Sequence, residues 1–201
     1  MYLRKYFIMG SQNCDRKPED ILKEAAKSGI TAFQFREKGE GALTGEKKLA
    51  LGRKLRDICA RHNVMFFVND DIDLIEPLEA DGIHIGQDDM RLEKVREMFP
   101  DKLIGLSVSN QSDVDNSSIQ LADYLGAGSV FSTPSKDDAG HAVGIEWIKT
   151  LRRQYPDIPI VGIGGITEEN ASSVIDAGAD GVAVISAITK AGNVTEAVEK
   201  L

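Results

Sequence analysis

Short apolar runs recur along the whole chain, and a stretch with helical spacing follows most of them. The runs predict strands because neighbouring positions are all apolar and because each run ends at polar residues or glycine. The expected strands are residues 6–9, 32–36, 64–68, 82–85, 103–107, 124–127, 160–163 and 181–185. The expected helices are residues 18–28, 44–61, 71–76, 91–99, 113–121, 145–155, 170–177 and 195–201. Continuously apolar strands of this kind are typical of a sheet that is covered on both faces.

This alternation of strand and helix predicts an α/β fold with a parallel sheet. Eight units match a closed (β/α)8 TIM barrel, with an open doubly wound sheet as the alternative. No linker or composition shift divides the chain, so residues 1–201 are expected to form a single barrel domain. Ala-Asp pairs precede three strands, at Asp81, Asp123 and Asp180. We interpret these as equivalent turns at the amino-terminal end of the barrel, with a structural role.

Composition narrows the function classes. The chain has 201 residues, 42% of them hydrophobic and 28% charged, which is typical of a soluble globular domain. A net charge of -8 argues against binding to nucleic acid or to an anionic membrane. Cys14 and Cys59 are too few for a disulfide framework or a zinc site, and Cys59 is expected to be buried. No apolar run reaches signal or transmembrane length, so a cytoplasmic protein is expected; a homo-oligomer is compatible with the sequence.

Two of the expected strands run directly into acidic residues. Asn69 and Asp70 follow the strand 64–68, and Asp89 follows the strand 82–85. Because the carboxyl ends of barrel strands form one rim, these carboxylates are expected to meet there. Oxygen ligands of this kind favour Mg²⁺ over zinc. The alternative is that acids here only cap the following helices, which is the expectation for Asp71 and Asp88.

Cations and glycines are expected on the same rim. Gln34 and Arg36 are two residues apart, so both should face the barrel interior, where a guanidinium beside a divalent cation suits a diphosphate. The glycines at 162–165 suit a phosphate near Ser186, although they are also compatible with tight turns alone. His84 is interpreted as a hydrogen-bonded residue inside the barrel and not as a base. The sequence therefore predicts two substrates, one with a phosphate and one with a diphosphate leaving group.

Seven motifs, in this order, resemble the thiamine-phosphate synthase family, and the resemblance covers nearly the whole chain. They are Gln34–Lys38, Val68–Asp71, Gly82–Asp89, Gly105–Ser107, Thr133–Lys136, Val161–Thr167 and Val184–Ser186. The resemblance implies a transferase that joins 4-amino-2-methyl-5-hydroxymethylpyrimidine diphosphate to a thiazole phosphate (or its carboxylated form) and releases pyrophosphate. The reaction is expected to proceed through Mg²⁺-assisted dissociative loss of the pyrophosphate.

The same resemblance assigns the site residues. Asp70 and Asp89 hold Mg²⁺. Catalytic roles go to Arg36, Lys38, Ser107 and Lys136. The substrate-binding positions are Gln34, Phe35, Arg36, Glu37, Lys38, Asn69, Ser107, Thr133, Pro134, Ser135, Lys136, Gly165, Ile185 and Ser186. Of these, Thr133, Ser135, Gly165, Ile185 and Ser186 belong to the thiazole phosphate.

The loop 128–136 departs from the family pattern. The family usually has Gly-Pro and then Pro-Thr-x-Thr-Lys, whereas this chain has Gly128-Ser129 and then Ser132-Thr-Pro-Ser-Lys136. Three other functions remain open: a Schiff-base aldolase or epimerase that uses Lys136, a thiazole tautomerase, and a non-catalytic sensor of thiazole phosphate. A polar setting for Lys136 disfavours the first, and a complete set of diphosphate and metal residues disfavours the other two.

Overall fold

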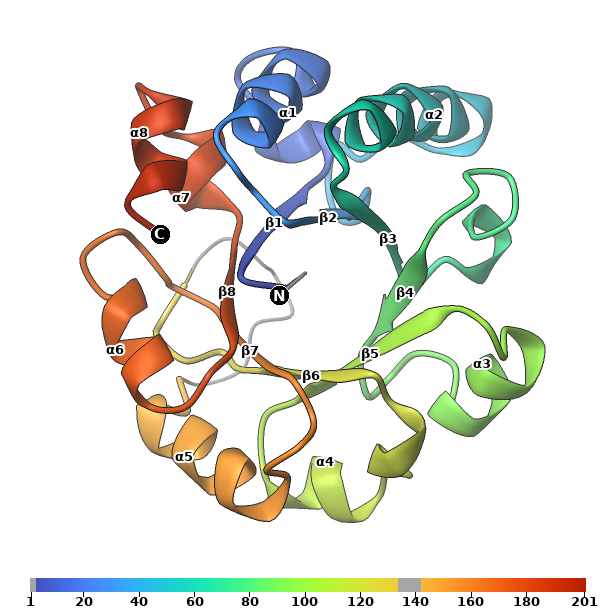
Figure 1. Ribbon diagram of the computed structural model, residues 1–201. Helices are drawn as coiled ribbons and strands as arrows, with labels where there is room; N and C mark the ends of the chain where they lie inside the picture. Colours follow the sequence, from blue (N-terminus) through green and yellow to red (C-terminus); the bar gives the residue numbers. More distant parts are fainter. Residues whose placement is uncertain (1–2, 134–141) are drawn as a thin grey trace.

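The structure is a computed structural model that describes residues 3–133 and 142–201, and in this part of the chain eight parallel strands close into a barrel (Figure 1). Strand β1 pairs with β2 on one side and with β8 on the other, where Lys5 lies opposite Val182. The closed barrel confirms the predicted fold and excludes the open sheet. The strands are β1 (Lys5–Met9), β2 (Ala32–Phe35), β3 (Met65–Asn69), β4 (Gly82–Ile85), β5 (Leu103–Val108), β6 (Tyr124–Ala127), β7 (Ile160–Ile163) and β8 (Gly181–Val184).

Helices surround the barrel and connect successive strands (Figure 1). The α-helices are α1 (Pro18–Lys27), α2 (Gly45–His62), α3 (Leu92–Met98), α4 (Gln111–Asp115), α5 (Ile145–Gln154), α6 (Ala171–Asp176), α7 (Ser186–Thr189) and α8 (Val194–Glu199). The 3-10 helices are η1 (Ser11–Asn13), η2 (Ile72–Leu74) and η3 (Ile119–Leu121).

Two expected helices differ from the observed ones. The segment 71–76 is reduced to η2, and the segment 113–121 divides into α4 and η3. In the second case the Ser117 hydroxyl donates a hydrogen bond to the carbonyl of Asp113 at 2.7 Å. Short polar side chains that bond to nearby backbone groups compete with helix continuation, and Asn116, Ser117 and Ser118 stand together at the break.

The strands alternate between two apolar layers. Phe7, Phe33 and Phe66 belong to the layer between barrel and helices. Tyr6 and Phe67, their neighbours in sequence, belong to a second cluster that fills the barrel interior. This period of two follows from the strand geometry, which points successive side chains to opposite faces. Interior-facing positions in β2 to β5 therefore continue upward to the carboxyl ends of the strands.

The Ala-Asp turns have the structural role expected of them. Asp123 accepts hydrogen bonds from the N–H of Ile104 at 2.7 Å and from the Arg96 guanidinium at 2.5 Å. Asp180 accepts in the same way from the N–H of Ile160 and from Arg152. Asp81 accepts from the N–H of Phe66. Each aspartate thus joins the start of its own strand to the preceding strand, away from the carboxyl ends.

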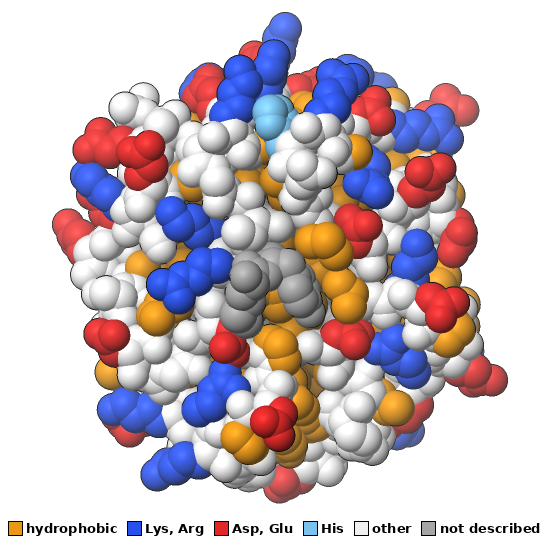
Figure 2. All heavy atoms as spheres, in the orientation of Figure 1, with side chains coloured by type: hydrophobic (Ala, Val, Ile, Leu, Met, Phe, Trp, Pro, Cys, Tyr) orange, Lys and Arg blue, Asp and Glu red, His pale blue; other side chains and the backbone are white. Residues whose placement is uncertain are grey.

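On the face shown in Figure 2, acidic and basic side chains are interspersed around the periphery. Among the described residues, no helix has the length and apolar character needed to cross a bilayer.

Candidate active site

The carboxyl ends of β2, β3 and β4 bring together the acidic and basic residues that the sequence places there. Arg36 follows β2, Asn69 ends β3, and Asp89 lies in the turn after β4. Gln34 is 1% exposed and Arg36 is 6% exposed, so both are buried, as their spacing predicts. The side chain of Arg36 and that of Lys38 line one cavity of about 450 Å³ together with Ile185 and Ser186.

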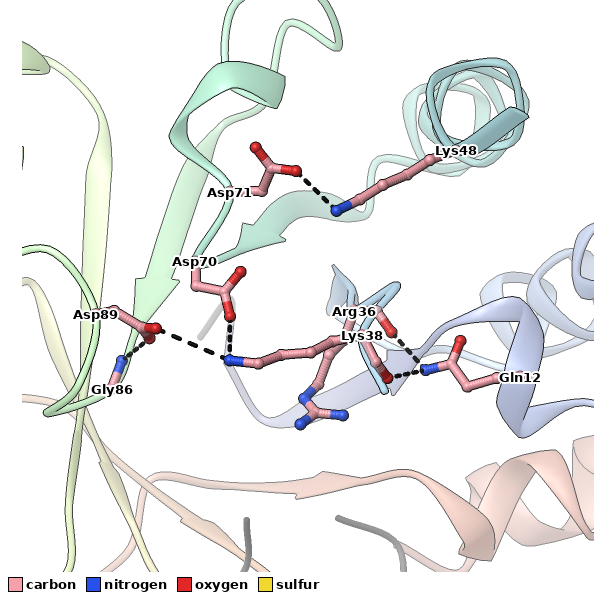
Figure 3. A network of polar contacts seen from close by, with 8 residues as sticks. All are labelled: Gln12, Arg36, Lys38, Lys48, Asp70, Asp71, Gly86 and Asp89. Atoms are coloured by element: carbon pink, nitrogen blue, oxygen red, sulfur yellow. Dashed lines mark hydrogen bonds and ion pairs between the residues drawn. The ribbon is translucent and has the colours of Figure 1, made fainter. Parts of the chain in front are cut away.

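The Lys38 ammonium lies between the two carboxylates that were predicted to hold a metal (Figure 3). Its Nζ is 2.5 Å from Asp70 Oδ2 and 3.8 Å from Asp89 Oδ1. Asp89 Oδ2 also accepts a hydrogen bond from the N–H of Gly86 at 2.7 Å, which fixes the turn that carries it. The two carboxylates are therefore close enough to share one cation.

A tight turn after β3 positions Asp70. Its backbone has a φ of 48°, in the left-handed region, where aspartate is among the better tolerated residues. The N–H of Asp70 donates to the carbonyl of His84 at 2.9 Å, and this bond ties the turn to β4. The adjacent Asp71 points elsewhere and pairs with Lys48 at 2.7 Å (Figure 3). Asp71 makes no side-chain cap to η2, so its predicted capping role is wrong.

The donor set fits Mg²⁺ and not a metal that needs a cage of protein ligands. Within residues 3–133 and 142–201, no group of three or more His, Cys, Asp or Glu side chains is arranged to hold a metal ion. Asp70 and Asp89 supply two hard oxygen ligands and already hold one cationic group. Mg²⁺ commonly binds through one or two carboxylates and completes its shell with water and substrate phosphates.

Gln12 also lines this cavity, and its Nε2 donates to the carbonyls of Arg36 and Lys38, both at 3.0 Å (Figure 3). Two buried oxygens at this cavity, Gln12 Oε1 and Thr189 Oγ1, have no hydrogen-bond partner among the described residues. Buried polar atoms of this kind are costly unless something binds them. They favour a cavity that a polar ligand or water occupies.

A second pocket lies at the ends of β7 and β8, where a phosphate was expected. Its lining includes Thr133, Gly164, Gly165, Ile185 and Ser186. Gly165 has a φ of 63°, and a Cβ built on it would be 2.6 Å from the carbonyl oxygen of Ser132. Glycine is therefore required here for its conformation and for close packing against the loop that leads to Thr133, so the tight-turn role is real. The N–H groups of a glycine-rich loop are also suited to an anion.

Two predicted binding residues use their side chains for other contacts. Phe35 is 1% exposed and packs against Phe66 in the layer between barrel and helices, so its ring does not reach the rim. The Glu37 carboxylate accepts hydrogen bonds from the N–H and hydroxyl of Ser11 and from the N–H of Leu43. Glu37 thus holds the loops after β1 and β2 together. Pro134, Ser135 and Lys136 lie outside the described residues.

Sequence reasoning missed two tyrosines beneath the site. Tyr6 and Tyr124 are buried in the barrel interior and hydrogen-bond to each other and to polar residues of β2 and β4. Each tyrosine lies at the start of a short apolar strand, and its hydroxyl needs a hydrogen-bond partner when it is buried. This could have indicated a polar contact, but tyrosine in a strand is usually a packing residue. His84 lies in this network, which confirms the prediction of a hydrogen-bonded interior residue.

Comparisons with known proteins agree with this geometry. The sequence profile of the family described as thiamine monophosphate synthase matches residues 5–188. A thiamine-phosphate synthase of Oceanobacillus iheyensis is 55% identical over 199 residues, which cover 99% of this chain and 97% of the relative. Thiamine-phosphate synthase 1 of Streptococcus pneumoniae is 46% identical over 200 residues, 99% of this chain and 96% of the relative.

Solved structures give the same result. A thiamine phosphate pyrophosphorylase from Pyrococcus furiosus superposes with a TM-score of 0.87 at 34% identity, covering 100% of this chain and 94% of that one. A 3-hexulose-6-phosphate synthase shares only the fold, with 14% identity and a TM-score of 0.64 over 98% of this chain and 97% of that one. The similarity to the thiamine-phosphate synthases and to the Pyrococcus furiosus structure extends through all the strands that form the rim.

Proposed function

The chain belongs to the thiamine monophosphate synthase family and is a transferase that makes thiamine phosphate; from that premise we propose which residues carry the reaction. The substrates are an aminopyrimidine methyl diphosphate and a thiazole phosphate. The observation that carries the assignment is the cation-binding arrangement of Asp70, Asp89 and Lys38 beside the buried Arg36. This arrangement places cationic groups and carboxylate ligands for a metal at the position where the diphosphate would leave.

The reaction begins with heterolytic cleavage of the bond between the pyrimidine methylene carbon and the diphosphate oxygen. Both electrons leave with pyrophosphate, and the aminopyrimidine ring shares the positive charge that remains. Arg36 binds the departing pyrophosphate as a fixed bidentate donor. Lys38 donates to the same group once the two carboxylates have released it. Because charge on the leaving group is highest in the transition state, these contacts favour the transition state over bound substrate.

Asp70 and Asp89 would hold Mg²⁺, and bound Mg²⁺ would supply two further positive charges at the diphosphate. The thiazole nitrogen then gives its lone pair to the methylene carbon and forms the new carbon–nitrogen bond. This nitrogen carries no proton, so no general base is needed. Its orientation depends on the phosphate pocket, where we assign the N–H groups of Gly165, Ile185 and Ser186 and the hydroxyl of Thr133 to the thiazole phosphate.

Lys136, Ser135 and Pro134 keep their assigned roles as part of this proposal, with Lys136 as a third cation at the pyrophosphate. The side chain of Phe35 is left out of the ligand-binding set, and Glu37 is assigned a supporting role through the loops that it holds.

The test is pyrophosphate release from purified protein given both substrates and Mg²⁺. We expect pyrophosphate release only when both substrates and Mg²⁺ are present. A thiazole tautomerase or a sensor would release none under the same conditions. Asp89→Asn should lower turnover by about 10²-fold, the usual loss for one group that stabilises transition-state charge. The amide oxygen can still accept from Gly86, so the turn is preserved.

The matched control is Asp71→Asn, which changes an adjacent carboxylate that pairs with Lys48 and not with Lys38. Its turnover should stay near wild type. If Asp89→Asn is as active as Asp71→Asn at limiting Mg²⁺, the metal assignment is wrong.

A further inference from the structure

A chain of hydrogen bonds crosses the barrel interior from β2 to β5. Gln34 Nε2 contacts the Tyr6 hydroxyl at 3.0 Å, and this hydroxyl contacts that of Tyr124 at 2.9 Å. Tyr124 contacts His84 Nδ1 at 2.9 Å, and His84 Nε2 contacts Ser107 Oγ at 2.8 Å. The two ends of this hydrogen-bond chain, Gln34 and Ser107, are residues that the family resemblance assigns to binding of the pyrimidine diphosphate.

The packing around this chain leaves its members little freedom. Tyr6, Gln34 and Tyr124 are at most 2% exposed. A Cβ at Gly105 would lie 2.1 Å from the Tyr124 ring, so the ring occupies space that glycine leaves open. Gly126 does the same for His84, whose Cε1 would be 2.9 Å from a Cβ there. Rings held in this way keep their hydrogen-bonding atoms in place.

The donors along the chain can be ordered from its Gln34 end. Gln34 Nε2 can only donate, so the Tyr6 oxygen accepts from it. Either hydroxyl could donate in the bond between Tyr6 and Tyr124, and a Tyr6 proton on that bond gives one continuous order of donors. Tyr124 in turn donates to His84 Nδ1. A neutral His84 must then carry its proton on Nε2 and donate it to Ser107 Oγ. The hydroxyl proton of Ser107 is left to point toward the site.

At the other end of this hydrogen-bond chain, Gln34 presents an acceptor where Ser107 presents a donor. Gln34 uses its amide N–H on Tyr6, and its Oε1 is buried with no hydrogen-bond partner among the described residues. An unpartnered buried acceptor is expensive in the free protein. It becomes favourable when a ligand brings a donor to it.

We propose that Tyr6, Tyr124 and His84 are positioning residues that fix Gln34 as an acceptor and Ser107 as a donor, and thereby select a 4-aminopyrimidine over a 4-oxopyrimidine. An aminopyrimidine offers an amino donor and a ring-nitrogen acceptor, which match the two ends. A 4-oxopyrimidine offers a carbonyl acceptor and a ring N–H donor. Its carbonyl would face the Gln34 oxygen, another acceptor, and its N–H would face the Ser107 hydroxyl, another donor. The inference rests on the proposed function and adds to it the reason for base selectivity.

The direction of the chain can be measured without catalysis. Nitrogen-15 NMR of histidine-labelled, ligand-free protein distinguishes the two neutral tautomers of His84, and the missing signal in His84→Gln assigns it. We expect the Nε2–H tautomer in wild type. The Nδ1–H tautomer would mean that His84 donates to Tyr124 and accepts the Ser107 hydroxyl proton at Nε2, which would overturn the proposal.

Selectivity is the second readout. Wild type should use the 4-amino diphosphate far better than the 4-oxo analogue in pyrophosphate release. Tyr6→Phe touches neither Ser107 nor His84, yet it removes the bond that sets the direction. It should mix the two tautomers of His84 and reduce the amino-to-oxo ratio of kcat/KM by about tenfold or more. Tyr124→Phe should act in the same direction and provides a second variant if the first folds poorly.

Tyr155→Phe is the matched control, because Tyr155 is the residue directly after α5 and packs against the apolar layer between barrel and helices, not in the barrel interior. It should change neither the tautomer nor the ratio. An unchanged ratio in folded Tyr6→Phe and Tyr124→Phe would overturn the proposal. If wild type releases no pyrophosphate from either pyrimidine, the proposed function fails instead, and the tautomer of His84 still tests the chain.

Discussion

Replacing Lys38 by methionine should strengthen metal binding while it weakens catalysis. The Lys38 ammonium holds Asp70 at 2.5 Å and lies 3.8 Å from Asp89, so a divalent cation has to displace it from both. Methionine has nearly the length of lysine and no charge. Lys38→Met therefore removes the competing cation and leaves both carboxylates in place.

The magnitude follows from the exposure of the pair. The side chain of Lys38 is 45% exposed and that of Asp70 is 22% exposed, so solvent screens the attraction. Half-exposed ion pairs contribute about 0.2–1 kcal/mol. Because about 1.4 kcal/mol is a factor of ten in an equilibrium constant, the Kd for the metal should fall by up to about fivefold. Turnover should fall by about 10²-fold, because a cation that stabilises the leaving group is lost.

Mn²⁺ serves as the probe, since its binding to protein free of diphosphate is read directly by electron paramagnetic resonance. Lys48→Met is the matched control, because Lys48 pairs with Asp71 at 2.7 Å and does not touch the proposed ligands. Its Mn²⁺ affinity should equal that of wild type. Weaker Mn²⁺ binding in Lys38→Met would show that Lys38 supports the metal site and does not compete for it, and the reasoning would fail.

Three further predictions concern other parts of the molecule. Thr133→Val removes the hydroxyl assigned to the thiazole phosphate, so it should weaken binding of that ligand by about tenfold in calorimetry and spare the pyrimidine diphosphate; an equal loss for both ligands would argue against two separate sites. Asp123→Ala should lower the free energy of unfolding by about 1–3 kcal/mol in urea, whereas Asp15→Ala, at an exposed ion pair, should lower it by less than about 0.5 kcal/mol. Burial, with a smaller contribution from Glu37, raises the pKa of Cys14 to about 11, so only about one thiol in a thousand is ionised at pH 8. Alkylation of Cys14 by iodoacetamide should therefore rise about tenfold per pH unit up to that pKa, and a plateau near pH 9 would contradict it.

Most of the barrel could be predicted from sequence because its strands carry their own signal. The bounds of β4, β6 and β7 agree with the expected ones, since each is a continuous apolar run with a sharp polar or glycine boundary. The segment 113–121 could not be predicted as well. Its apolar spacing favours a helix, but the serines at 117 and 118 compete for backbone hydrogen bonds, and pattern alone does not decide that competition.

The site divides in the same way. The gathering of Asp70, Asp89 and Arg36 follows from topology, because parallel strands present their carboxyl ends on one rim. The contacts of Lys38 and Glu37 do not follow from topology. The side-chain torsions decide whether such a residue contacts a ligand, a carboxylate or a backbone amide of a loop. The Glu37 carboxylate accepts hydrogen bonds from two loops, at Ser11 and Leu43, and is not directed at a ligand in the cavity. No spacing rule in the sequence indicates this.

His84 connects the two halves of the site through different atoms. Its carbonyl accepts the N–H of Asp70 and so positions the turn that carries a proposed metal ligand. Its ring, on the opposite side of the same residue, bonds to Ser107 and Tyr124 in the interior. A substitution of His84 removes the ring contacts and keeps the carbonyl. The metal half should therefore survive changes that abolish base selectivity, which explains how one strand position can serve both halves without making either depend on the chemistry of the other.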